Sequence, residues 1–198
     1  MAKTIDYYHS LISPWSYLGG PRLHDIAAAA GATVNVKPID LARVFPVSGG
    51  LPLAKRADQR RAYRLAELAR WRDHLGMPLN IEPRSFPAAE GLAARTVIAA
   101  RQAGADAARL SNAILRAVWA EQRDIADRET LVAICAETGH DGAALTAAAE
   151  TDAIAAIYAA DTGEAIARGV FGAPTYVFEG ELFWGQDRLD FLARALDA

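Results

Sequence analysis

The sequence of 198 residues contains a single cysteine, Cys135. One cysteine excludes an internal disulfide framework and a Cys-x-x-Cys redox pair, because each of these needs at least two thiols. Cys135 follows the apolar run 131–134, so we expect it to be a core residue of a helix rather than a reactive thiol. Chemistry that needs a reactive thiol would therefore need one supplied from outside the chain.

A strong excess of charge and long apolar runs are also absent. The 21 Lys and Arg against 24 Asp and Glu give a formal charge of −3, which argues against nucleic acid as the main partner. No stretch of about 18 uncharged apolar residues occurs, and the first residues lack the apolar segment of a signal peptide. We therefore expect a cytoplasmic protein with no membrane partner. We expect no metal site, because the histidines lack metal-ligand spacing; they are His9, His24, His74 and His140.

The first 40 residues predict a strand, a helix and a second strand. Residues 5–8 are rich in Ile and Tyr and are typical of a strand. Ser13 is placed to cap a helix that has Pro14 at its first position and that ends before Gly31. Residues 34–39 then predict a second strand, and strand–helix–strand is the start of a parallel sheet.

Helical spacing dominates from about residue 57 to 168, with the clearest apolar face over 110–118. Strands are predicted at 175–178 and 181–184, joined by the tight turn Glu179–Gly180, and a last amphipathic helix at 189–196. This order predicts an α/β protein with a thioredoxin-like βαβ…ββα core and a large all-helical insertion. The predicted core domain comprises residues 1–43 and 168–198, and the inserted helical domain comprises residues 44–167.

Ser13-Pro14-Trp15-Ser16 opens the first helix directly after the first strand, where thioredoxin-like folds carry a reactive Cys-x-x-Cys. Hydroxyls replace both sulfurs, so disulfide exchange at this position is impossible. A serine at a helix N-terminus can instead donate a hydrogen bond to an anion such as a thiolate. The alternative is that Ser13 is only a helix cap. His9 is a candidate base for Ser13, but a packed strand position is the preferred interpretation.

Two further segments can bind a ligand. In Gly169–Thr175, a cis peptide bond at Ala173–Pro174 would leave the N–H and C=O of Ala173 free to pair with a peptide-like ligand. In Trp184–Arg188, N–H groups at a helix start can bind a carboxylate, and Asp187 can form an ion pair with an ammonium group. An ordinary X-Pro turn and an ordinary helix cap are the respective alternatives.

Together these segments resemble kappa-class glutathione S-transferases and 2-hydroxychromene-2-carboxylate isomerases, which share a DsbA-like thioredoxin fold. The resemblance extends over essentially the whole chain. It rests on four segments, which are Ser13–Leu18, Ile39–Val44, Gly172–Thr175 and Trp184–Arg188.

The resemblance implies an enzyme that uses glutathione as cofactor and forms a homodimer. Ser13 would be the catalytic residue, hydrogen-bonded to the glutathione sulfur, while Ala173 and Pro174 would pair with its cysteinyl part. The γ-glutamyl end would be surrounded by Trp184, Gly185, Gln186, Asp187 and Arg188. The isomerases interconvert 2-hydroxychromene-2-carboxylate and trans-o-hydroxybenzylidenepyruvate, and reversible thiolate addition allows the rotation this requires.

The substrate half departs from the isomerase pattern. Phe45 stands where isomerases of naphthalene breakdown carry lysine, and Phe86 stands where they carry tyrosine. Their Asn-Arg pair corresponds to Ala54-Lys55 here. We expect Lys55 to anchor the carboxylate of an aromatic substrate, with Phe45, Phe86 and Trp15 lining its site. A solvated helix face is the alternative for Lys55 and for the neighbouring Arg56, Arg60 and Arg61. Alternatives for the whole chain are a kappa-class transferase acting on other electrophiles and a non-catalytic glutathione- or peptide-binding module.

Overall fold

The computed structural model describes residues 2–197, so residues 1 and 198, the outer ends of the predicted core domain, lie outside the described residues. A four-stranded sheet has the order β2-β1-β3-β4, in which β1 and β2 are parallel and β3 is antiparallel to both of its neighbours. The strands are β1 (Thr4–His9), β2 (Thr33–Pro38), β3 (Thr175–Phe178) and β4 (Glu181–Trp184). All four predicted strands and the predicted parallel pair are confirmed.

Most of the helices occur in sequence between β2 and β3. Helix α1 (Pro14–Ala29) joins the two parallel strands, and α9 (Leu189–Asp197) follows β4 through the 3₁₀ turn η2 (Gln186–Arg188). The intervening helices are α2 (Leu41–Ser48), η1 (Leu53–Lys55), α3 (Asp58–Leu75), α4 (Gly91–Gln102), α5 (Ala107–Trp119), α6 (Arg128–Glu137), α7 (Gly142–Ala148) and α8 (Asp152–Ala167). This element order is the predicted α/β core with a helical insertion. None of the described helices is long and apolar enough to cross a lipid bilayer.

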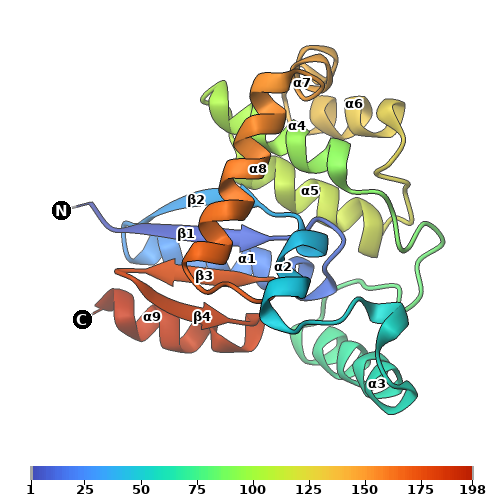
Figure 1. The fold of residues 1–198 in the computed structure, drawn as a ribbon, viewed down its shortest axis with the longest axis vertical. Coiled ribbons are helices and arrows are strands. Elements are labelled where there is room, and N and C mark those ends of the chain that lie inside the picture. The colour runs from blue at the N-terminus through green and yellow to red at the C-terminus, as the bar shows by residue number, and fades with distance from the viewer. Residues whose placement is uncertain (1, 198) are drawn as a thin grey trace.

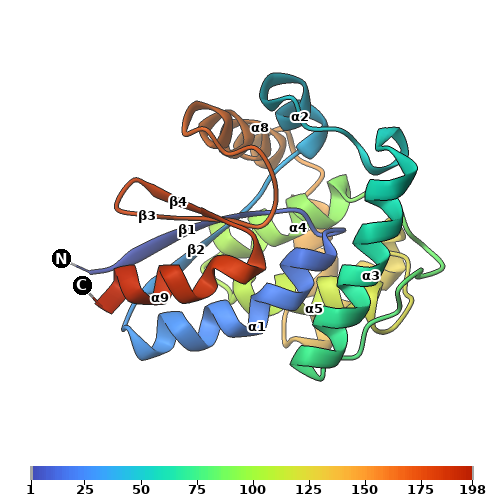
Figure 2. The same ribbon diagram turned by 90° about the horizontal axis from the view of Figure 1, so that it is seen from below.

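The sheet is a central layer with helices on both faces. Helices α1 and α9 cover one face, α8 lies over the other, and α3, α4 and α5 extend beyond one end of the sheet (Figures 1 and 2). Strand β1 serves both faces because its side chains alternate. Ile5 and Tyr7 belong to the main core, whereas Tyr8 belongs to a second cluster with Val44 of α2 and Ala165 of α8.

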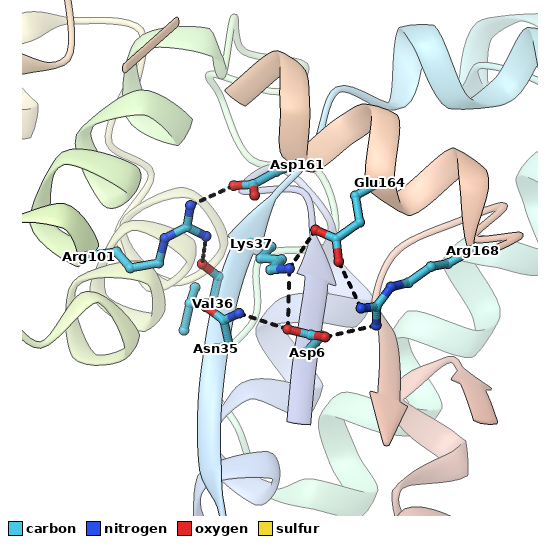
Figure 3. A network of polar contacts seen from close by, with 8 residues as sticks. All are labelled: Asp6, Asn35, Val36, Lys37, Arg101, Asp161, Glu164 and Arg168. Atoms are coloured by element: carbon cyan, nitrogen blue, oxygen red, sulfur yellow. Dashed lines mark hydrogen bonds and ion pairs between the residues drawn. The ribbon is translucent and has the colours of Figure 1, made fainter. Parts of the chain in front are cut away.

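A network of charges attaches α8 to the sheet (Figure 3). Lys37 of β2 is 8 % exposed, and its Nζ lies 3.3 Å from Asp6 of β1 and 2.6 Å from Glu164 of α8. Arg168, just after α8, contacts the same two carboxylates, each at 2.9 Å. Buried charges persist when they are paired in this way. The network therefore fixes the end of α8 just before the chain enters the loop that leads to β3.

The main core contains Trp119 and Cys135, both fully buried. Burial raises the pKa of the Cys135 thiol to about 11, which keeps it protonated and unreactive near neutral pH. The prediction that Cys135 is a core residue is confirmed. Trp71 is only partly buried and packs against that core.

Candidate active site

Ser13 lies where β1 ends and α1 begins. Its Oγ accepts a hydrogen bond from the Ser16 N–H at 3.2 Å, and Pro14 occupies the first position of α1, so the predicted cap is confirmed. Ser13 is 8 % exposed, whereas Ser16 is completely buried. Of the two hydroxyls at this spacing, Ser13 is therefore the one that a ligand can reach.

The loop before β3 lies against Ser13. The Ala173–Pro174 peptide bond is cis, the form considered in the sequence analysis. Ser13 Oγ donates a hydrogen bond of 3.3 Å to the carbonyl of Ala173, although the two residues are 160 positions apart. Ala173 lies outside the strand ladder, so its carbonyl is unpaired within the sheet as expected, and Ser13 is its partner in this structure. The contact is long for an O–H···O bond, so a stronger acceptor can replace it.

The segment after β4 joins the same loop. The Gly185 N–H donates to the Pro174 carbonyl at 2.9 Å. Gln186 is buried, and Arg22 of α1 donates to its side-chain oxygen at 2.7 Å and to its backbone oxygen at 3.1 Å. Asp187 and Arg188 are exposed and form an ion pair at 3.2 Å. Thus Asp187 and Arg188 offer charges to a ligand, whereas the side chain of Gln186 is engaged with Arg22.

Trp184 is held over the loop before β3. Its ring lies 4.7 Å from the ring of Phe171, measured between centroids. A Cβ atom at Gly172 would lie 2.5 Å from the indole nitrogen of Trp184, so the contact requires glycine at this position. Half of the Trp184 side chain remains exposed, which leaves an aromatic surface beside the Ala173 loop.

Glu90, which was not among the predicted site residues, also contributes to the site. Its carboxylate accepts hydrogen bonds from Ser10 Oγ at 2.9 Å and from the Leu11 N–H at 2.6 Å, in the loop that leads to Ser13. Burial raises the pKa of Glu90 to about 7, although the hydrogen bonds from residues 10–12 oppose this. No local pattern marks Glu90, because the contact spans 79 positions.

His9 does not act on Ser13. It is fully buried, its Nε2 lies 2.6 Å from the Ser111 hydroxyl, and its ring stacks on Tyr7 with centroids 4.4 Å apart. Burial lowers the pKa of His9 to about 3, so the ring is neutral at pH 7. The interpretation of His9 as a packed strand residue is confirmed.

Of the four predicted substrate residues, Phe86 is the one that lines either of two surface hollows. Phe86 lines a hollow of about 320 Å³ beside α3 and also a second hollow of about 400 Å³. The other three line neither hollow: Lys55 is exposed, Phe45 is half-buried next to Gly50, and Trp15 packs against the core. Arg64, which the sequence analysis did not consider, lines the smaller hollow together with Phe86.

The arrangement is suited to stabilising an anion at the start of α1. The Ser13 hydroxyl and the positive end of the α1 dipole meet there, and Ala173 lies beside them. Such donors lower the pKa of a thiol that is placed among them. In residues 2–197 no three His, Cys, Asp or Glu side chains are grouped as metal ligands.

Comparison with known proteins gives a consistent result. Residues 4–197 match the family model of the DSBA-like thioredoxin domain. A 2-hydroxychromene-2-carboxylate isomerase of Sphingobium xenophagum is 33% identical over 193 residues, which are 97% of each chain. One of Pseudomonas putida is 36% identical over 97% of this chain and 93% of its own. A solved structure of a 2-hydroxychromene-2-carboxylate isomerase superposes with a TM-score of 0.83 and 31% identity, covering 98% of this chain and 94% of the other.

Proposed function

Because the chain belongs to the DSBA-like thioredoxin domain family, and is an isomerase of the 2-hydroxychromene-2-carboxylate isomerase family, we propose that glutathione is its cofactor. The proposed reaction interconverts 2-hydroxychromene-2-carboxylate, or a related aromatic 2-oxo acid, and trans-o-hydroxybenzylidenepyruvate. When bound, glutathione would supply a thiolate that adds reversibly to a conjugated double bond and so permits rotation. The chain has no reactive thiol of its own for this purpose, since Cys135 is buried.

The observation that carries the proposal is the contact between Ser13 and Ala173. Their approach at the start of α1 is consistent with a thiolate bound by the Ser13 hydroxyl and by the helix N-terminus. Ala173 would pair through its backbone with the cysteinyl part of the tripeptide. The adjacent Asp187 and Arg188 carry the two charges that the amino and carboxylate groups of a γ-glutamyl end require.

The residues of the chain then have separate tasks. Ser13 donates a hydrogen bond to the sulfur and thereby favours the deprotonated thiol at neutral pH. Trp184 covers one side of the Ala173 loop and restricts the access of water to it. The substrate needs an apolar site for its ring and a cation for its carboxylate, and Phe86 is the predicted lining residue that lies in a hollow.

Two binding experiments test the role of Ser13. Calorimetry with millimolar glutathione should detect binding, and its absence would refute the proposal. Substitution of Ser13 by alanine removes one hydrogen bond to a charged group, worth about 1.5–3 kcal/mol. It should therefore raise the pKa of the bound thiol by about one to two pH units, measured from the ultraviolet absorbance of the thiolate. Ser16→Ala is the matched control, because the Ser16 hydroxyl is buried and should leave that pKa unchanged.

An activity assay separates the isomerase from the alternatives. The chromene should be converted only when glutathione is present. Conversion of a chloro-dinitrobenzene electrophile without conversion of the chromene would identify a kappa-class transferase instead. Glutathione binding with neither activity would identify a binding module.

A further inference from the structure

Arg64 faces the hollow of about 320 Å³ between α3 and the segment 81–86. Its guanidinium carbon lies 5.4 Å from the ring centroid of Phe86 and 5.8 Å from that of Trp119. Leu65 and Ile81 add apolar surface to the same hollow. Arg64 is half-buried, its guanidinium lies close to two aromatic rings, and its side chain lines the hollow.

Within residues 2–197, Arg64 has no carboxylate partner at ion-pair distance. Other arginines of α3 do have one: Arg61 pairs with Asp58 at 2.6 Å and Arg70 with Glu67 at 2.5 Å. Arg61 and the exposed Glu82 also line the hollow, but Glu82 forms an ion pair with neither Arg61 nor Arg64.

Burial, together with the smaller effect of the nearby Arg56 charge, lowers the pKa of Arg64 to about 10. Arg64 thus remains charged at pH 7, and the described residues 2–197 supply no counter-ion to it. A partly desolvated cation of this kind is stabilised by an anionic ligand that brings the missing charge.

We propose that this hollow binds a planar conjugated carboxylate, with Arg64 pairing with the carboxylate and Phe86 covering the ring. The inference deepens the proposed function, on which it rests, and assigns the carboxylate anchor to Arg64 instead of the exposed Lys55. Arg64 is therefore the residue that selects for a charged substrate.

The position of the hollow is compatible with this role. Helix α3 runs beside the first half of α1, the helix that begins next to Ser13 (Figure 2). Phe86 also lies four positions before Glu90, whose carboxylate holds the loop leading to Ser13. The volume is at the lower end of the range of small-molecule sites, about 300–1,000 Å³, and suits a ligand of one or two rings.

The test uses two probes of the same shape, trans-cinnamate and the uncharged trans-cinnamamide, without glutathione. Calorimetry should show that the wild-type protein binds cinnamate more tightly than cinnamamide. Arg64→Leu keeps apolar contact with Phe86 but removes the charge, and should weaken cinnamate binding about 10- to 100-fold. Arg60→Leu is the matched control: Arg60 is exposed on the same helix, does not line the hollow, and its loss should leave binding unchanged.

Arg64→Lys keeps the charge and should retain part of the affinity for cinnamate, while losing the two-point contact of a guanidinium. Equal binding of the two probes by the wild-type protein would overturn the proposal, whether or not Arg64→Leu folds. Unchanged cinnamate binding in Arg64→Leu, or an equal loss in Arg60→Leu, would also overturn it. If cinnamate binding depends on Arg64 but the protein binds no glutathione, this site stands and the proposed function fails.

Discussion

Substitution of Glu90 by glutamine should change how the stability of the protein depends on pH. The carboxyl of Glu90 has a pKa of about 7 in the folded protein, mainly because of burial, against 4.5 for a free glutamate. Between these values the folded state binds more protons than the unfolded state, so stability falls as the pH rises. The difference of about 2.5 pH units, at about 1.4 kcal/mol each, corresponds to about 3 kcal/mol. This contribution is fully present below pH 4.5 and lost above about pH 7.

The assay is denaturant unfolding of the wild-type protein and of Glu90→Gln at a series of pH values from about 4.5 to 8.5. The free energy of unfolding of the variant, minus that of the wild-type protein, should increase by about 3 kcal/mol over this range. Glu82→Gln is the control, because Glu82 is exposed and lies in the same segment between α3 and α4. The free energy of unfolding of this variant, minus that of the wild-type protein, should stay constant over the range. A constant difference for Glu90→Gln would refute the reasoning and show that the loop before Ser13 accommodates the charged carboxylate without cost.

Two further substitutions test the packing around the site. Lys37→Met leaves Arg168 as the remaining cation beside the carboxylates of Asp6 and Glu164. The substitution should lower the free energy of unfolding by about 2 kcal/mol. An unchanged free energy of unfolding in denaturant would contradict this. Gly19→Ala would place a Cβ atom 2.7 Å from the Tyr176 hydroxyl and 2.9 Å from Gln186. It should cost about 1–3 kcal/mol and weaken glutathione binding in calorimetry, whereas Gly163→Ala in α8, with open space around it, should not destabilise.

Local patterns predicted the elements of the fold well. Alternating and β-branched residues marked β3 and β4, which the structure has at the predicted bounds. The predicted turn Glu179–Gly180 is confirmed, because both residues adopt positive φ, at 51° and 87°, as a two-residue hairpin loop requires. Ser13 and Pro14 marked the start of α1 for an equally local reason. The division into domains 1–43 with 168–198 and 44–167, and the homodimer, stay predictions.

The candidate site was predictable in part. Ser13, Ala173 and Trp184 were found from local motifs, namely Ser-Pro-Trp-Ser at a helix start, an X-Pro turn and the segment after the last strand, and from the family resemblance that these motifs share. Phe86 was identified as a lining residue, whereas Lys55 is exposed and lines neither hollow. Their roles toward glutathione and substrate stay predictions until binding is measured.

The sequence by itself determined the order of strands and helices, the helix cap at Ser13, and the absence of a redox pair of cysteines. These are local properties, because a cap, a turn or a missing sulfur involves only neighbouring residues. Only the tertiary structure decided that Glu90 holds the loop before Ser13 and that Arg64 faces aromatic rings with no counter-ion among residues 2–197. Burial and charge pairing depend on residues far apart in the chain, and they change the properties of a side chain without leaving a pattern around it.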